Sequence, residues 1–243
     1  MSRRQTTRNS AGRVAEKTVK VPDHRSRLLL VEGVPGLGKS TVLDHLARRH
    51  VAEAEPRRVR TLLHLTQAHT YGPLARREDA GTLTRGECLA HLERIVAGLE
   101  WLAASVRGES TTKCFVLVDC LHLTACLRPG VVRWPDVVSL DRRMAETGCR
   151  LLLLDGTDET VRERAVRARM DTDFIRGYAA RRFGRSEAEL VRHFRRERDA
   201  FRELFAASAM TRLCLPAEAP EEATAAGAFR FWKDHGWDGT KEG

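Results

Sequence analysis

The sequence lacks the features that mark membrane and secreted proteins. No apolar run approaches the ~20 residues of a membrane-spanning helix, so we expect no membrane association. The N-terminus is charged but no apolar segment follows it, which argues against a secretory signal. The chain also contains no internal repeat and no low-complexity block. With 243 residues, it is long enough for one domain with a full core and some additional segments.

Cysteine is present, but without the spacing that metal sites require. None of the six cysteines belongs to a Cys-x-x-Cys pair, so a zinc site is not expected. Several lie in apolar, strand-like runs, and we interpret all six as buried, reduced thiols. Because reduced thiols are typical of the cytosol, we expect a cytoplasmic protein.

Aromatic residues are scarce, since Phe, Trp and Tyr together make up 6% of the chain. Only two residues are tyrosines, which leaves little material for a surface on which nucleic-acid bases stack. The Asn-Lys-x-Asp sequence by which GTPases read a base is absent, which disfavours a nucleotide-dependent switch. Arginine, in contrast, is abundant, and the formal net charge of +9 suits an anionic substrate.

The most specific motif follows the apolar run at residues 28–31 and precedes a helical pattern at 39–50. A Gly, four free positions and Gly-Lys-Ser form the phosphate-binding P-loop pattern. Glycines permit positive φ, successive N–H groups surround an anion, and the next helix adds a favourable dipole. A glycine-rich turn before a helix is the simpler alternative, but the flanking strand and helix favour a P-loop. The residues expected to hold donor phosphates are Gly33, Val34, Pro35, Gly36, Leu37, Gly38, Lys39, Ser40 and Thr41.

Two further groups are expected to complete the phosphate chemistry. Lys39 is placed to neutralise the β- and γ-phosphates, and Ser40 to bind Mg²⁺. The apolar run at 114–118 ends in Asp119, which is the Walker B pattern. Its carboxylate would bind Mg²⁺, directly or through water, or accept a proton from an attacking hydroxyl. The alternative is an Asp that only caps the next turn, and the P-loop upstream favours the functional role.

An arginine-rich helix is predicted over residues 160–170, after an apolar strand at 149–154. Arg164 and Arg167 are three positions apart and therefore on adjacent turns of one face, and Arg169 follows them. A solvated basic helix is the alternative. The position of the helix after the fourth strand favours an arginine clamp that stabilises charge on the transferred phosphoryl group.

Polar residues after the second predicted strand, at 59–65, are candidates for a substrate pocket. Gln67, His69 and Tyr71 leave the carboxyl end of a parallel strand, where open α/β sheets bind ligands. An ordinary solvated loop is equally consistent with their pattern. His122 is a further candidate because it follows Asp119 closely, although a structural histidine is the alternative.

Strands alternate with helices along the chain, which predicts a parallel sheet with helices on both faces. Residues 1–24 are polar and basic, and we expect a flexible tail there. A tail that contacts nucleic acid or a partner is the alternative. Residues 25–243 are expected to form the folded domain, with a mobile stretch over 72–81.

The segment Leu-Val-Glu-Gly-x-x-Gly-x-Gly-Lys-Ser-Thr resembles the thymidylate kinase and deoxynucleoside kinase branch of the P-loop kinases. Asp119 sits where that family has an Asp-Arg or Glu-Arg pair after the third strand. Residues 163–169, which read Glu-Arg-x-x-Arg-x-Arg, are similar to the start of the family's lid. Residues 211–216 and the acidic helix start after them are similar to the last strand and helix, where the adenine ring usually rests.

The resemblance implies a P-loop NTPase fold, an α/β three-layer sandwich with a central parallel five-stranded sheet of order 2-3-1-4-5. It implies Mg²⁺, ATP or GTP as the phosphoryl donor, and a lid over about 160–186 that closes to exclude water. The expected catalytic residues are then Lys39, Asp119, Arg164, Arg167 and Arg169. Ser40 and Asp119 are the expected metal ligands.

Two departures from the family bear on the acceptor. Cys120 stands where the family has an arginine that helps to hold the acceptor, and no Glu-Pro pair follows the second strand. We therefore expect transfer of the γ-phosphate to a hydroxyl of a small molecule, either a nucleoside or a nucleoside-like compound such as an antibiotic. The alternatives are a nucleoside monophosphate kinase of thymidylate kinase type and a nucleic-acid 5′-end kinase, although a nucleic-acid partner is not favoured. The sequence leaves a homodimer open.

Overall fold

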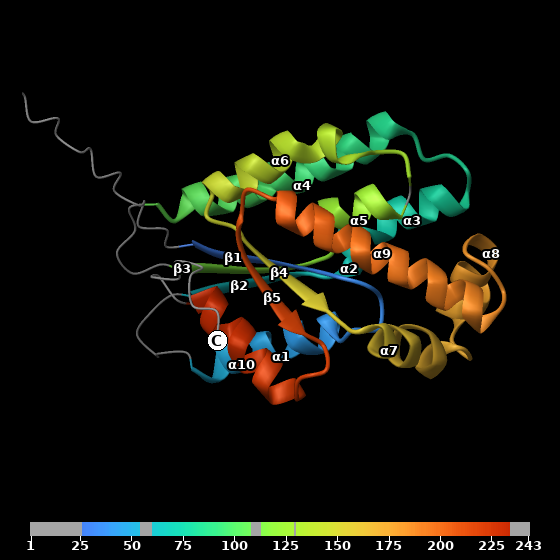
Figure 1. The fold of residues 1–243 in the computed structure, drawn as a ribbon. Helices are drawn as coiled ribbons and strands as arrows, with labels where there is room; N and C mark the ends of the chain where they lie inside the picture. Colours follow the sequence, from blue (N-terminus) through green and yellow to red (C-terminus); the bar gives the residue numbers. More distant parts are fainter. Residues whose placement is uncertain (1–25, 54–59, 108–112, 129, 234–243) are drawn as a thin grey trace, which may run out of the picture.

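The computed structural model describes residues 26–53, 60–107, 113–128 and 130–233. The tail expected over 1–24 lies outside these residues. Five strands form one sheet, and every neighbouring pair is parallel, in the order β2-β3-β1-β4-β5 (Figure 1). The expected order 2-3-1-4-5 is therefore confirmed. The strands are β1 (Ser26–Glu32), β2 (Arg60–Leu65), β3 (Lys113–Asp119), β4 (Arg150–Asp155) and β5 (Thr211–Pro216).

The three central strands are continuous apolar runs because both faces of the sheet are covered. In β1 every side chain from Leu28 to Val31 is at most 1% exposed, and β3 and β4 are buried to a similar extent. The outer strands β2 and β5 are more exposed, and their sequences carry polar residues. The sequence pattern and the strand order therefore agree.

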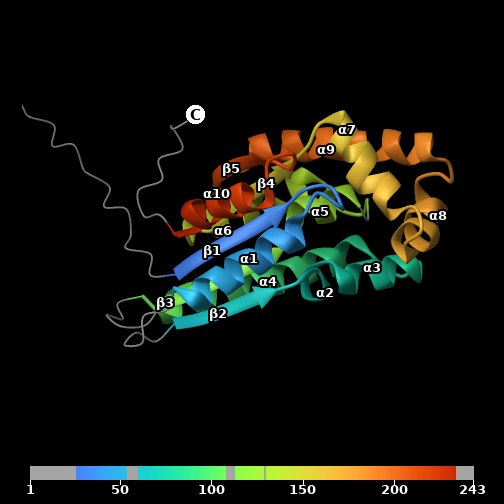
Figure 2. The same cartoon turned by 90° about the horizontal axis from the view of Figure 1, so that it is seen from below.

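Helices cover both faces and complete the three-layer sandwich (Figures 1 and 2). One face carries α1 (Lys39–Ala52) and α10 (Glu221–Lys233), which pack against each other. The other face carries α4 (Arg85–Ser105), α5 (His122–Leu127), α6 (Trp134–Glu146) and α9 (Glu187–Ala207). None of the described helices is both long enough and apolar enough to cross a membrane.

Local signals in the sequence explain where the longer helices begin. Thr84 and Glu87 form a capping box at the start of α4, and Ser186 and Glu189 form one at the start of α9. In each box the two residues satisfy N–H groups that the first helical turn leaves without partners. Pro135 lies in the first turn of α6, where its missing N–H costs nothing.

The stretch over 72–81, which we expected to be mobile, is largely helical. The segment after β2 forms α2 (Gln67–Thr70) and α3 (Gly72–Asp79). Pro73 occupies the first turn of α3, where its fixed φ favours a helix, and the buried Leu74 attaches the helix to the core. Arg76, Arg77 and Asp79 lie on its exposed side.

The arginine-rich segment is helical but not one α-helix as expected. It contains α7 (Asp158–Thr160), the π-helix η1 (Val161–Val166) and the 3₁₀-helix η2 (Arg167–Arg169), followed by the π-helix η3 (Phe174–Ala179) and α8 (Ala180–Arg182). These short helices and α3 lie beyond the carboxyl ends of the strands in Figures 1 and 2. Arg182 joins the two groups, because its guanidinium pairs with Glu78 and Asp79 of α3.

All six cysteines are unpaired, in agreement with the expected reduced thiols. The expectation that all are buried is only partly correct. Cys126 is half-buried and Cys214, on the outer strand β5, is exposed.

Candidate active site

The P-loop joins β1 to α1 and uses its glycines for two different purposes. Gly33, Gly36 and Gly38 have φ angles of 138°, 86° and 95°, which residues with a Cβ rarely adopt. A Cβ on Gly36 would lie 2.5 Å from the backbone oxygen of Arg164, whereas a Cβ on Gly38 would meet no atom within 4 Å. Gly36 therefore allows the close approach of η1, and Gly38 is needed for the turn alone.

The Lys39 side chain is buried and folds back across the P-loop. Its Nζ donates hydrogen bonds to the carbonyl oxygens of Gly33, at 2.8 Å, and Val34, at 3.1 Å. These bonds hold the positive charge against the loop, and the same residue lines a cavity beyond it. An anion that enters the loop therefore meets a cation that is already in position.

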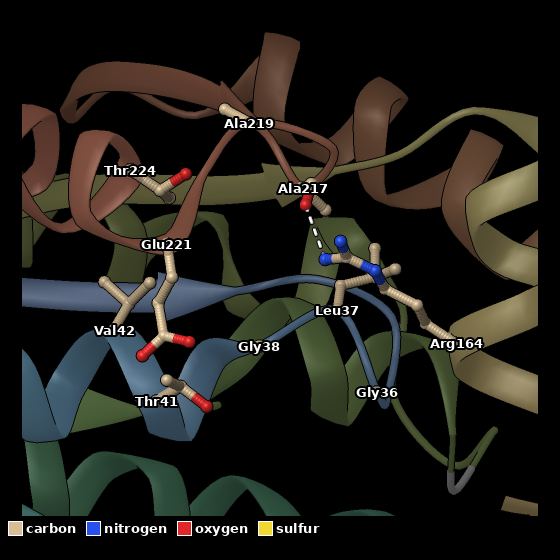
Figure 3. Close-up of a pocket in the computed structure, with 10 residues that line it drawn as sticks. All are labelled: Gly36, Leu37, Gly38, Thr41, Val42, Arg164, Ala217, Ala219, Glu221 and Thr224. Atoms are coloured by element: carbon tan, nitrogen blue, oxygen red, sulfur yellow. Dashed lines mark hydrogen bonds between the residues drawn. The ribbon is translucent and has the colours of Figure 1, made fainter. Parts of the chain in front are cut away.

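A first cavity of about 310 Å³ lies between the P-loop and the connection from β5 to α10 (Figure 3). Arg164 crosses one side of it and donates from Nη1 to the backbone oxygen of Ala217 at 2.6 Å. Glu221, at the start of α10, points toward Thr41 on the opposite side in Figure 3. The lining residues are Gly36, Leu37, Gly38, Thr41, Val42, Arg164, Ala217, Ala219, Glu221 and Thr224.

A second cavity of about 320 Å³ lies on the other side of the P-loop. Gly36, Gly38 and Thr41 line both cavities, so the two meet at the loop. The second cavity collects residues from β3, α2 and the arginine-rich segment. Its lining residues are Pro35, Gly36, Gly38, Lys39, Ser40, Thr41, Gln67, Asp119, Arg128, Arg169 and Phe174.

Asp119 reaches the second cavity because β3 pairs with β1 in a fixed register. Asp119 lies opposite Val31, two residues before the first glycine of the P-loop. Its backbone oxygen accepts a 2.6 Å hydrogen bond from the Thr70 hydroxyl. The Cys120 thiol donates to Asp119 Oδ1 over 3.2 Å. Burial raises the pKa of this thiol to about 12, so it stays neutral and serves as a donor.

The chain turns sharply after Asp119. Cys120 has a φ of 56° and is the one non-glycine residue with positive φ in the part of the chain that the structure describes. Glu32, buried at the end of β1, fixes this turn: its Oε1 accepts from the backbone N–H of Leu121 at 2.8 Å, and its Oε2 accepts from the Thr124 hydroxyl at 2.6 Å. Glu32, which precedes the P-loop, therefore stabilises the turn after Asp119.

Arg128, which the sequence analysis missed, lies in the second cavity beside Arg169. It follows α5 directly and is fixed by a 2.9 Å bond from its Nε to Oε1 of the buried Glu197 on α9. The Arg169 guanidinium stacks on Phe174, with 4.2 Å between Cζ and the ring centroid. No sequence motif surrounds Arg128, so only the packing of α5 against α9 indicates its position.

Comparison with solved structures places this arrangement in a known fold. YorR of Bacillus subtilis, solved in complex with phosphorylated GDP, is 11% identical with a TM-score of 0.52, over 84% of this chain and 94% of that chain. A gluconokinase from Sinorhizobium meliloti 1021 is 16% identical with a TM-score of 0.47, over 83% of this chain and 89% of that chain. No protein-family model and no curated protein sequence matches the chain.

The chain has the P-loop NTPase fold. The sheet order, the loop after β1 and the acid at the end of β3 all agree with this fold. The likeness to YorR extends to the architecture alone, so the chemistry must be argued from the residues of this chain.

The residues proposed to bind the substrate have different surroundings in this P-loop fold. Gln67 lines the second cavity. Tyr71 is buried beside it: its hydroxyl donates to Glu78 over 3.0 Å, and its ring centroid lies 5.4 Å from Arg128 Cζ. His69 is exposed, with its Nδ1 3.1 Å from the Thr66 hydroxyl. Gln67 therefore faces the cavity, and Tyr71 supports its wall.

His122 is in the interior and not among the residues that line the second cavity. Its Nε2 lies 3.0 Å from Oδ1 of Asp141, a carboxylate that also accepts bonds from Ser208 and the backbone of Ala209. Burial raises the pKa of Asp141, but these hydrogen bonds outweigh it and lower the pKa overall. This hydrogen-bond network connects α5 and α6 with the turn before β5. The surroundings of His122 therefore fit a structural histidine, which was the alternative to a substrate ligand.

The three arginines that were predicted to form one clamp do not lie together. Arg169 lines the second cavity and Arg164 the first. Arg167 pairs with Glu163 at 2.6 Å and with Glu187 at 2.8 Å, and it lines neither cavity. The π-helix η1 has a wider turn than an α-helix, so side chains that share a face at a spacing of 3.6 do not share one here.

Proposed function

We propose that this protein is a Mg²⁺-dependent phosphotransferase, which moves the γ-phosphate of ATP or GTP to a hydroxyl of a small molecule. The observation that carries the proposal is the meeting of two cavities at one P-loop, through Gly36, Gly38 and Thr41. The first cavity suits the base of the donor, and the second suits the acceptor. The loop between them would hold the phosphates, with Lys39 beside the β,γ-bridge.

The reaction breaks the bond between the γ-phosphorus and the β,γ-bridging oxygen and forms a bond from that phosphorus to the acceptor oxygen. The nucleoside diphosphate leaves, and the acceptor proton passes to Asp119 or to solvent. Asp119 is 4% exposed and lines the second cavity, so it is sheltered but reachable. Arg169, in the same cavity, would stabilise the charge on the transferred group.

The Ser40 hydroxyl and the Asp119 carboxylate would hold Mg²⁺. Both line the second cavity, and both provide the hard oxygen atoms that this ion prefers, with the donor phosphates as further ligands. The ion supplies charge neutralisation between the β- and γ-phosphates when it is bound. The protein itself holds Asp119 in place through the turn at Cys120, which Glu32 stabilises by accepting a hydrogen bond from Leu121.

Arg164 is assigned to the donor base in this proposal. Its guanidinium is held across the first cavity by the backbone oxygen of Ala217, where a planar group would stack on a purine. YorR, which shares the fold, was solved with phosphorylated GDP, and GTP therefore stands beside ATP as a donor. For the acceptor we retain a nucleoside or nucleoside-like compound, including antibiotics. The segment over about 160–186 would act as the lid.

The test is transfer of labelled γ-phosphate from ATP and from GTP, with Mg²⁺, across nucleosides, nucleoside monophosphates and antibiotics. Labelled product that requires both an acceptor and the intact P-loop supports the proposal. Binding of the triphosphates without acceptor-dependent transfer contradicts it. Phosphorylation of oligonucleotide 5′-ends in preference to every small molecule would instead support the nucleic-acid kinase alternative.

A further inference from the structure

Two guanidinium groups line the second cavity, and part of the hydrogen-bonding capacity of each is not used. Nη2 of Arg128 and Nη1 of Arg169 are buried nitrogen atoms without a hydrogen-bond partner. The Arg128 side chain is only 5% exposed and is therefore largely shielded from bulk solvent. A buried cationic donor without an acceptor is costly, and such groups commonly mark the site of an absent ligand.

The charges around these groups favour an anion. Glu197 pairs with Arg128, but no carboxylate pairs with Arg169 among the described ion pairs. Burial and then the charge of Arg128 lower the pKa of Arg169, and both guanidinium groups line the same cavity. Lys39 adds a third cation to the cavity, and Asp119 is the one acid among its described lining residues.

We propose that the acceptor carries an oxyanion, either a phosphate or a carboxylate group, and that Arg128 and Arg169 bind this group in the second cavity. The inference rests on the proposed function and narrows it, since it restricts the acceptor of the same reaction to compounds that carry an oxyanion and disfavours neutral nucleosides. Planar guanidinium groups suit both oxyanions because each offers parallel N–H donors to paired oxygens.

The position of Arg128 assigns it to the acceptor and not to the donor. Arg128, Gln67 and Phe174 line the second cavity only, whereas the P-loop residues at the junction line both. The donor phosphates already have the loop N–H groups and Lys39. Phe174 beneath Arg169 and Tyr71 beside Arg128 hold the two guanidinium groups in place.

Arg128 also supplies the positive charge that a neutral thiol at Cys120 does not provide. The family that the sequence resembles has an acceptor-holding arginine beside the acid of β3, and here a neutral thiol takes that position. Arg128, further along the chain, brings a guanidinium to the same cavity from the end of α5. The loss of one arginine therefore does not leave the cavity without a cation for the acceptor.

The test uses the full chain with Mg²⁺ and a non-hydrolysable ATP or GTP analogue, so that the donor site is filled. Inorganic phosphate and acetate are then titrated calorimetrically as probes of a second anion site. We expect phosphate, acetate or both to bind. Arg169→Gln should weaken that binding at least about tenfold, while affinity for the donor analogue changes less than about twofold. Arg192→Gln, which removes an exposed charge from α9, is the matched control.

Arg128→Gln alone leaves Glu197 buried without its partner and would destabilise the fold. The double variant Arg128→Gln with Glu197→Gln removes both charges, so that neither is left buried without a partner. In transfer assays, we expect the double variant to raise KM for anionic acceptors at least about tenfold and to leave KM for their neutral counterparts unchanged. Arg169→Gln should in addition lower kcat with both kinds of acceptor, because Arg169 is also assigned to the transferred group. Nucleoside monophosphates paired with nucleosides, and sugar acids paired with neutral sugars, separate phosphate from carboxylate recognition.

The outcomes separate the two proposals. If no triphosphate analogue binds, the proposed function fails. If the donor binds and transfer occurs, but neutral acceptors are preferred and the arginine variants bind both probes as wild type does, the function stands and the inference is overturned.

Discussion

In the proposed reaction single residues would carry the phosphate chemistry, and Lys39 would carry the largest share. Its ammonium is buried and already directed into the P-loop by the carbonyl oxygens of Gly33 and Val34. Because the charge is fixed before a donor arrives, little reorganisation is needed when charge develops on the phosphates.

Lys39→Ala should lower kcat by at least about 100-fold, since a preorganised cation is lost from a sheltered site. The two lost hydrogen bonds should cost about 1–2 kcal/mol of unfolding free energy, so the variant stays folded. Steady-state transfer assays and denaturant unfolding measure the two effects. Arg48→Ala, which removes an exposed charge from the same helix, should change neither. Activity of Lys39→Ala near that of wild type would refute the role given to this residue.

The P-loop glycines allow a second test at this scale. Gly38→Ala introduces a Cβ that meets no atom, so its cost should be only the strain of a positive φ, about 1–2 kcal/mol. Gly36→Ala adds a clash with the backbone of Arg164, so it should destabilise further and displace η1. Unfolding free energies and donor affinity compare the two variants. Equal effects of both substitutions would mean that the approach of η1 to the loop is not tight.

The P-loop and Asp119 could be predicted because their chemistry is local to the chain. Each is a contiguous pattern at the end of an apolar run, and the sheet register brings the two together. Arg128 could not be predicted, because its place depends on the contact with Glu197 on a helix that is distant in sequence. His122 looked like a ligand because of its spacing from Asp119, and its partner Asp141 is equally remote.

Among the elements, the helices beyond the carboxyl ends of the strands are where sequence and structure differ most. The strands and the longer helices followed from apolar periodicity and capping boxes. The π-turns of η1 and η3 have no such signal, and η1 packs against α9 and the P-loop. At Gly36 the backbone of η1 comes so close that only a glycine fits, which fixes its path.

Arg182 links the proposed lid to α3, because its guanidinium pairs with Glu78 and Asp79. Arg182→Ala should loosen the short helices around it, because α8 has no side-chain cap at its N-terminus and begins after a π-turn. We expect at least about tenfold faster amide exchange over residues 160–186 and a higher KM for the acceptor. Arg181→Ala, an exposed neighbour, is the control. Unchanged exchange in Arg182→Ala would show that other contacts hold the lid.

Across the whole molecule, the two cavities and the buried contact between α1 and α10 lie at opposite ends of the sheet. The cavities lie at the carboxyl ends of the strands, whereas α1 and α10 are joined near the amino ends by His50 and Lys233. Lys233 Nζ lies 2.5 Å from His50 Nδ1, and the His50 ring packs 4.1 Å from the Phe115 ring. Burial and then the charge of Lys233 lower the pKa of His50 from 6.5 to about 4.

This arrangement predicts a pH dependence of stability that is separate from activity. As pH falls below 6.5 the unfolded chain binds a proton at His50, but the folded chain does so only near pH 4. The stability advantage of wild type over His50→Gln should therefore be constant above pH 7 and shrink between pH 6.5 and pH 4, by about 1–3 kcal/mol. Denaturant unfolding at several pH values measures it. Parallel curves for the two proteins would contradict the buried, neutral His50.

The most direct test of the account follows the labelled γ-phosphate of ATP or GTP in the presence of Mg²⁺ and a panel of anionic and neutral small molecules. We predict that the label appears on a small acceptor with the wild-type protein, and that Asp119→Asn and Lys39→Ala, although folded, transfer at most about 1% as fast. Label that goes only to water, or transfer that persists undiminished in both variants, would contradict the central claim that the P-loop and Asp119 form one phosphoryl-transfer site.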